Sequence, residues 1–105
     1  MLVIVKPHEI LKPLLRTWRR SLSKEPEARQ ALAALYWSEL ERRIVEAKGP
    51  PTGSICDDST NPPTYWSELT GGAWVQLVVL ADRKKGLFSS VREVIAINLV
   101  AHPPV

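Results

Sequence analysis

The periodicity of the apolar residues changes at Gly49-Pro50-Pro51, near the middle of the 105-residue chain. Between residues 8 and 48, apolar residues recur every three or four positions, which is the period of an α-helix. The later apolar runs alternate or are continuous, as in β-strands. A glycine followed by two prolines does not continue a helix. The sequence therefore predicts one α+β domain, residues 1–105, in which helices and most strands occupy separate halves.

Two helices are predicted before this break. The first covers residues 12–22 and has Pro13 in its first turn, where proline is tolerated. The second covers residues 24–48, with Ser23 as its N-cap and Gly49 after its last turn. The stripe of the second helix that should face the core consists of Leu32, Leu35, Tyr36, Leu40, Ile44 and Ala47.

Four strands are predicted, at residues 2–5, 64–69, 74–80 and 93–101. Thr70-Gly71-Gly72 is predicted to be a tight turn, and residues 49–63 and 82–90 are expected to be loops. The element order is therefore β-α-α-β-β-β. We expect the last three strands to form an antiparallel sheet that carries both helices on one face, with the first strand joining that sheet.

The pentapeptide Tyr-Trp-Ser-Glu-Leu occurs twice, at residues 36–40 and at residues 65–69. The flanking sequences differ, so the two copies do not mark a duplicated unit. The surrounding patterns predict that the first copy is helical and the second is a strand. Local propensity is weak enough to permit both.

The chain has a net charge of +3, and its basic residues are concentrated in the first half. Residues 1–48 carry ten basic and six acidic side chains, whereas residues 49–105 carry four basic and five acidic ones. Such a basic half either favours phosphate groups or is the solvated surface of the helices. The single Cys56 excludes an intramolecular disulfide, which fits a cytoplasmic protein. No pattern predicts a membrane span, a metal site or another cofactor.

Because side chains alternate along a strand, each predicted strand has two different faces. The aliphatic faces should pack on the helices, and they consist of Val75, Leu77 and Val79 in one strand and Ile95, Ile97 and Leu99 in the last. The opposite faces carry Gln76, Asn98 and His102. We expect Trp66 and Glu68 on that uncovered side as well, because Leu69 belongs in the core.

These residues define a candidate site on the uncovered face. Its predicted members are Trp66, Glu68, Gln76, Asn98 and His102, with Arg83, Lys84, Lys85 and Arg92 as a basic rim for RNA. Glu68 and His102 are the candidate catalytic residues, because a carboxylate and an imidazole can move protons. Cations hold phosphate, and an aromatic ring such as Trp66 stacks on a base. The alternative is that the polar side chains only solvate an uncovered sheet and that His102 is a chain-end histidine in water.

The element order and two short stretches resemble the RelE/ParE superfamily of bacterial toxins from toxin–antitoxin systems, especially its YoeB-like members. Tyr65-Trp66-Ser67 is similar to an aromatic-Trp-Ser stretch that opens the final meander of those members. The run from Val94 to His102 is similar to the last strand of the family, which ends in a histidine. A short first strand followed by two helices, the second long and charged, completes the resemblance.

The resemblance implies a small, basic, cytoplasmic toxin that is neutralised by a cognate antitoxin protein. Many family members cleave messenger RNA on the ribosome, and others poison DNA gyrase. His102 would then be the general acid or base, and Glu68 the carboxylate that some members use. Residues 74–80 contain no arginine, which the family typically carries in this strand. The resemblance is therefore to a divergent relative, either an endoribonuclease or a catalytically degenerate form. The alternative class is a non-catalytic module that holds a protein on the open sheet face or the helix pair.

Overall fold

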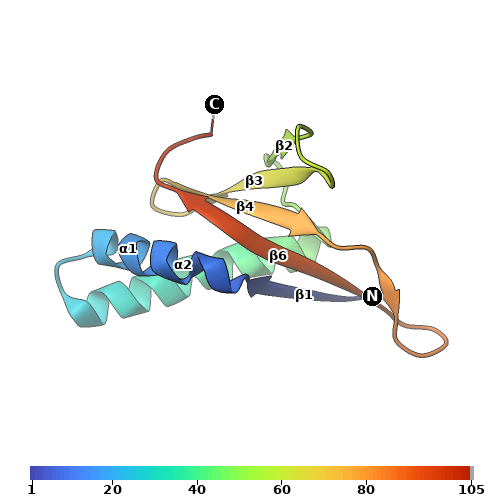
Figure 1. The fold of residues 1–105 in the computed structure, drawn as a ribbon. Coiled ribbons are helices and arrows are strands. Elements are labelled where there is room, and N and C mark those ends of the chain that lie inside the picture. The colour runs from blue at the N-terminus through green and yellow to red at the C-terminus, as the bar shows by residue number, and fades with distance from the viewer. Residues whose placement is uncertain (105) are drawn as a thin grey trace.

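The computed structural model describes residues 1–104 and has the α+β architecture that the sequence predicts. Its elements are β1 (Leu2–Pro7), the 3₁₀ turn η1 (Glu9–Leu11), α1 (Lys12–Leu22), α2 (Pro26–Ala47), β2 (Ile55–Asp57), β3 (Thr64–Leu69), β4 (Ala73–Val79), β5 (Arg83–Lys84) and β6 (Ser90–Val100). Figure 1 shows one sheet and, beside it, a hairpin formed by the two helices.

The strands form a single mixed sheet in the order β1-β6-β4-β3-β2. β1 runs parallel to β6, whereas β3, β4 and β6 form the predicted antiparallel meander. Two short strands lie in segments that the sequence predicts as loops: β2 pairs with β3, and β5 pairs with the start of β6. They have three and two residues. That is too few for an alternating pattern to be recognised, and each forms along the free edge of a longer strand.

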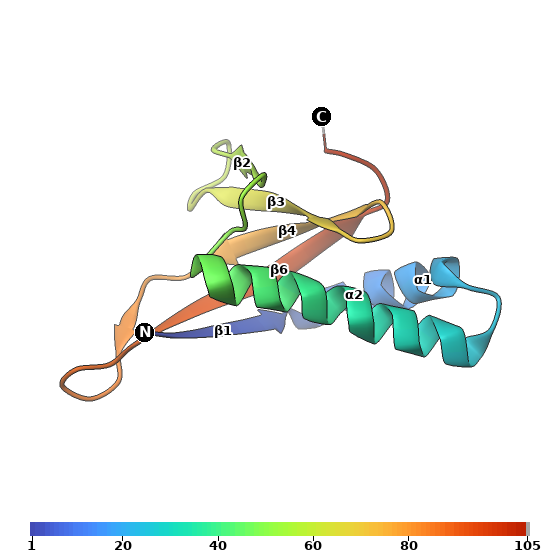
Figure 2. The same ribbon diagram turned by 180° about the vertical axis from the view of Figure 1, so that it is seen from behind.

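α2 covers one face of the sheet and leaves the other face bare. In Figure 2, α2 crosses in front of β6 and β4, whereas no helix crosses the front of these strands in Figure 1. The core lies between α2 and the sheet, and its fully buried side chains include Leu40 and Ile44 from α2 and Val75 and Leu77 from β4. We call the opposite side of the sheet the bare face.

The turn between β3 and β4 joins the sheet to the helical hairpin, and it is the turn that the sequence predicts. Gly71 has a φ of 101°, a conformation that glycine adopts readily. A Cβ atom at Gly71 would lie 3.6 Å from the Leu22 side chain and 3.7 Å from the Tyr36 ring. The Thr70 hydroxyl donates a hydrogen bond of 2.9 Å to the Glu39 carboxylate of α2. The turn therefore docks on both helices.

α1 has its predicted bounds, whereas α2 is shorter than predicted at both ends. α2 begins at Pro26, because Glu25 is still extended and acts as the N-cap residue. It ends at Ala47, and Lys48 rather than Gly49 adopts the left-handed conformation that closes the helix, with a φ of 57°.

The core-facing stripe of α2 also differs from the prediction at one edge. Leu35 is 52% exposed, whereas Ala33 is buried and Trp37 packs against the core. Residues in a helix are about 100° apart, so Leu35 points roughly 200° away from Ala33. Tyr36, Leu40 and Ile44 face the core as predicted, and Ala33 and Trp37 join them. The predicted Ala47 is instead exposed.

β6 changes the face that it presents to the helices partway along its length. Ala96 pairs with Leu77, and Asn98 pairs with Gln76, so Ile97 is an extra residue without a partner in β4. This is a β-bulge, which shifts the alternation of side chains by one position.

The bulge makes part of the predicted face assignment wrong. Val94 and Ala96 belong to the core before the bulge, and Leu99 belongs to it afterwards, as predicted. Ile95 instead pairs with Val78 on the bare face, and Ile97 is the bulged residue. The predicted core face of β4 is confirmed for Val75, Leu77 and Val79.

The repeated pentapeptide takes both predicted conformations. Residues 36–40 lie in α2, and residues 65–69 form most of β3. In the strand copy, alternation buries Ser67 and Leu69, whereas in the helical copy Leu40 is the fully buried residue. Tertiary packing therefore decides the conformation of this sequence.

Replacing Leu77 with alanine should test the position of the core. Leu77 has no exposed surface, so Leu77→Ala should lower the free energy of unfolding by about 2–5 kcal/mol. Leu87→Ala is the matched control, because Leu87 is 90% exposed, and it should change that free energy by about 0.5 kcal/mol or less. Urea unfolding followed by circular dichroism measures both. Equal effects of the two variants would contradict this description of the core.

Candidate functional site

The strand register arranges the side chains of the bare face in rows. One row crosses β3, β4 and β6 through Trp66, Gln76 and Asn98. The next row crosses the same strands through Glu68, Trp74 and Val100. Four of the residues that the sequence predicts as a site, namely Trp66, Glu68, Gln76 and Asn98, therefore lie on neighbouring strands at one end of the bare face.

Two tryptophans are diagonal neighbours on this face. Trp66 lies opposite Gln76, and Trp74 lies opposite Glu68 on the adjacent pair of positions. Diagonal side chains of this kind are within reach of each other when they are aromatic. Both indoles are partly exposed. The predicted site includes Trp66 alone, although the alternation of β4 already puts Trp74 on the same face as Gln76.

The two amides in the first row each use one of their polar atoms within the protein. Gln76 Nε2 donates a 2.8 Å hydrogen bond to Thr64 Oγ1. Asn98 Oδ1 accepts a 2.9 Å hydrogen bond from the backbone N–H of Leu99, next to the bulge. Asn98 therefore supports the local backbone. The remaining Gln76 oxygen and Asn98 nitrogen have no hydrogen-bond partner within residues 1–104.

The two candidate catalytic residues lie at the same end of the sheet. The Glu68 side chain is exposed, and its backbone oxygen accepts a 2.6 Å hydrogen bond from Arg43 of α2. Glu68 and Val100 are two strands apart in one row, which separates their backbones by about 10 Å. His102 follows Val100 by two residues, lies beyond the end of β6 and is exposed, with Nδ1 3.4 Å from the Pro103 oxygen.

The predicted basic rim does not surround this cluster. Arg83 and Lys84 form β5, and Lys84 pairs with Ser90 at the opposite end of β6 from Asn98. Eight residues of strand separate Ser90 from Asn98, which corresponds to about 25 Å. Arg83 is also engaged, because it donates a 2.9 Å hydrogen bond to Glu93, which Lys6 approaches at 3.3 Å. The polar cluster and the β5 cations are therefore at opposite ends of the sheet.

Arg92 lies on the side of the sheet that faces the helices. It pairs with Val3, a residue that packs against the core. Its guanidinium group donates hydrogen bonds of 2.7 and 2.9 Å to Asp82 and one of 2.7 Å to the Lys48 backbone oxygen. Arg92 thus ties the start of β6 to the end of α2 and to the segment before β5.

The hydrogen bond from Arg92 holds the pKa of the Asp82 carboxyl below its ordinary value, although partial desolvation opposes this shift. The same contact raises the pKa of Arg92. A carboxyl whose pKa is lower in the folded state stabilises the fold above its unfolded pKa of about 3.9. That stabilisation is lost as the pH falls through the folded pKa.

Acid titration of an Asp82→Asn variant tests this ion pair. Between about pH 5 and pH 2, the parent should lose more of its free energy of unfolding than Asp82→Asn does, because only the parent has a carboxylate to protonate at this position. Asp57→Asn is the control, since the Asp57 carboxylate accepts hydrogen bonds from the nearby Ser59 rather than from a cation. Parallel pH profiles of the parent and Asp82→Asn would show that the ion pair adds no stability.

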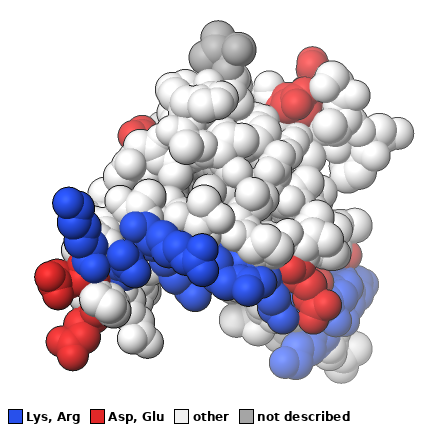
Figure 3. Space-filling model, turned by 60° about the vertical axis from the view of Figure 1, so that its left-hand side comes forward, with Lys and Arg blue, Asp and Glu red and all other residues white. Residues whose placement is uncertain are grey.

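A second basic surface is not among the predicted site residues. Arg16, Arg19 and Arg20 lie on one side of α1, and within residues 1–104 none of them is within 4.0 Å of a carboxylate. Figure 3 shows the band of basic side chains on this side of the molecule. Their spacing of three and four residues is the available signal, but on its own it indicates only a basic helix surface.

No family model, curated protein or solved structure matches this chain. The resemblance to RelE/ParE toxins therefore rests on the short motifs and on the layout of the elements. No helix in the described part of the chain combines the length and apolar character that crossing a membrane requires. Residues 1–104 also contain no group of three or more His, Cys, Asp or Glu side chains placed to hold a metal ion.

Proposed function

We propose that this protein is a RelE/ParE-like toxin that acts on RNA. The observation that carries the proposal is the cluster on the bare face, where Trp66, Gln76 and Asn98 form one row and Trp74 and Glu68 stand in the next. An uncovered sheet with neighbouring aromatic side chains is a common platform for single-stranded RNA, because unpaired bases stack on the rings.

The polar atoms around the tryptophans suit base recognition. The free oxygen of Gln76 is an acceptor, and the free nitrogen of Asn98 is a donor, so together they can address the edge of a stacked base. Stacking on Trp66 or Trp74 would contribute about 1–3 kcal/mol for each base, whichever base it is. The tryptophans would supply affinity, and the amides would supply base preference.

Glu68 and His102 supply the acid–base pair for cleavage. A carboxylate takes the proton from the ribose 2′-hydroxyl as the oxygen attacks the adjacent phosphorus, and an imidazolium gives a proton to the departing 5′-oxygen. The two residues lie at the same end of the sheet, and neither is buried. β4 has no arginine to stabilise the charge that develops on the phosphate. A catalytically degenerate relative that only binds RNA is the weaker form of the same proposal.

A cognate antitoxin protein is the partner that the proposal requires, since a growth-inhibiting protein must be neutralised in its own cell. Messenger RNA on the ribosome is the proposed target.

His102→Ala should reduce RNA cleavage by about 10²–10⁴-fold, because general acid–base catalysis contributes about that much. The exposed position of His102 after β6 means that the fold should remain intact. Inducible expression in bacteria, with growth and translation followed, measures the effect in cells. His8→Ala is the matched control, since His8 is also exposed and follows β1 instead. Normal growth during strong expression of the unmodified protein would overturn the proposal, and equal toxicity of both variants would remove His102 from the mechanism.

The salt dependence of RNA binding tests the β5 cations. Replacing Arg83, Lys84 and Lys85 with alanine should weaken binding and flatten the salt slope by about 0.7 for each phosphate of single-stranded RNA that these side chains neutralise. Replacing Lys12, Lys24 and Arg42 with alanine changes the net charge by the same amount at exposed positions outside both proposed sites, and it serves as the control. A slope that the β5 variant leaves unchanged would mean that these cations do not touch RNA.

A second candidate function is protein binding without catalysis, with the partner held on the bare face. The observation in its favour is Val78, a half-buried aliphatic residue of β4 on the same face as the two tryptophans, which no helix covers within residues 1–104. Uncovered apolar surface of this kind marks interaction sites. Replacing Val78 with aspartate would abolish such an interaction, whereas His102→Ala would not affect it. RNA cleavage by the unmodified protein would exclude this alternative.

A further inference from the structure

A hollow of about 690 Å³ lies between α1 and α2, away from the bare face. Its lining residues include Arg16, Trp18, Arg19, Arg20, Arg29 and Trp37. Four of these are arginines, and none is acidic. The volume is within the range of small-molecule sites.

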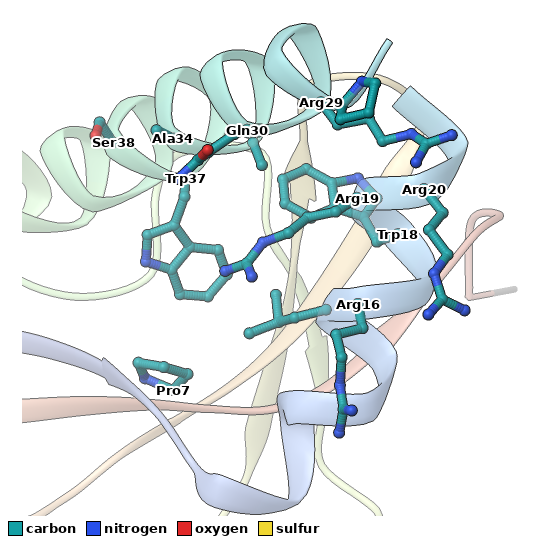
Figure 4. Close-up of a pocket in the computed structure, with 13 residues that line it drawn as sticks. Pro7, Arg16, Trp18, Arg19, Arg20, Arg29, Gln30, Ala34, Trp37 and Ser38 are labelled. Carbon is teal, nitrogen blue, oxygen red and sulfur yellow. The ribbon is translucent and has the colours of Figure 1, made fainter. Parts of the chain in front are cut away.

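The arginines come from both walls of the hollow. Arg16, Arg19 and Arg20 project from α1, and Arg29 projects from the start of α2, as Figure 4 shows. Arg29 Nε donates a hydrogen bond to the Ser23 backbone oxygen, which leaves its terminal nitrogens for other acceptors. In Figure 4 the Arg19 guanidinium points toward Trp37, whereas those of Arg16, Arg20 and Arg29 point in other directions. Arginine side chains are long and flexible, and an anion with several oxygen atoms would accept hydrogen bonds from those that turn toward it.

The floor of the hollow provides a place for a ring. Trp37 hangs from α2 into the space between the helices, and the Arg19 side chain points toward it in Figure 4. The small side chains of Ala33 and Ala34 leave room beside the indole. A planar heterocycle can therefore stack on Trp37 while its charged substituent faces the arginines.

Trp18 brings an unpaired donor to the wall of the hollow. Its side chain lines the hollow and is 6% exposed, and its Nε1 is a buried donor without any hydrogen-bond partner among residues 1–104. Such orphaned donors are rare in native proteins, because leaving one unpaired costs free energy.

We propose that the hollow between α1 and α2 binds a nucleoside polyphosphate, with the base on Trp37 and the phosphates on Arg19, toward which the other lining arginines turn when the ligand is bound. An acidic peptide would satisfy the charges but would leave the space beside the indole unused, so a compact ligand that joins a ring to several phosphates fits better. The site shares no residue with the proposed RNA surface, and the two proposals can fail independently.

Calorimetric titration with ATP, tripolyphosphate and adenosine tests the proposal. ATP should bind, and tripolyphosphate and adenosine should each bind at least about tenfold more weakly. Tripolyphosphate lacks the base that stacks on Trp37, and adenosine lacks the phosphates that contact the arginines. A polyglutamate peptide is the fourth probe. Absence of ATP binding, or equal affinities for ATP and either tripolyphosphate or polyglutamate, would overturn the proposal.

Three variants locate the bound nucleotide. Arg19→Gln should weaken ATP binding by about tenfold or more, since the substitution removes a charge-assisted hydrogen bond to phosphate. Trp37→Ala should weaken it by about fivefold or more, since the base then has no ring to stack on. Arg42→Gln removes the same charge from an exposed position on α2, where Arg42 is paired with Glu46, and should leave the affinity within about twofold. Thermal unfolding confirms that each variant is folded. Equal losses of affinity in Arg19→Gln and Arg42→Gln would show that only net charge matters and that the hollow is not the site.

Discussion

β6 is the strand on which the rest of the fold depends. It is eleven residues long and pairs with β1 on one side and with β4 and β5 on the other. A parallel partner needs a long connection, so the chain must leave the sheet after β1 before it can return as β6. The α1–α2 hairpin forms the first part of that connection and lies against one face of the sheet. The parallel pairing of β1 with β6 thus requires a crossover, and α2, the longer helix of that crossover, packs on one face of the sheet.

The uncovered face is the direct consequence. Residues 1–104 contain two α-helices, and the longer one, α2, crosses the opposite face. The tryptophans of β3 and β4 therefore remain accessible, and the strand register decides which polar groups stand beside them. The helical hairpin extends past the end of β1, which opens the arginine-lined hollow. Two surfaces of different chemistry arise from one topology.

Most of the fold could be predicted from the sequence because the local signals agreed. The identical pentapeptides in α2 and β3 are the clearest example, since only the surrounding periodicity distinguishes them. The bulge at Ile97 could not be predicted, because both faces of β6 are apolar in this region and alternation has no polar residue to follow except Asn98. The polar Asn98 was assigned to the uncovered face, and this assignment correctly put its neighbour Leu99 in the core. The bulge at Ile97 reverses the alternation for the residues before it. The same alternation therefore put Ile95 on the wrong face.

The candidate site was predictable only in part, for a similar reason. Alternation along each strand correctly grouped Trp66, Glu68, Gln76 and Asn98, since these residues lie on adjacent strands. Alternation carries no information about position along the strands. It therefore could not show that the β5 cations lie at the far end of the sheet. The hollow depends on how two helices diverge, which the sequence of each helix alone does not specify.

The indole N–H signals of the four tryptophans provide the most direct test of the RNA surface. Trp66 and Trp74 stand on the bare face, Trp37 lines the hollow and Trp18 is buried. The four signals can be assigned in ¹H–¹⁵N spectra by single Trp→Phe substitutions and followed during titration with single-stranded RNA that has a 5′-hydroxyl end. We expect the Trp66 and Trp74 signals to move together with RNA concentration while the Trp18 signal stays in place. Shifts confined to Trp37, or no shift of any indole signal, would contradict the assignment of the bare face to RNA.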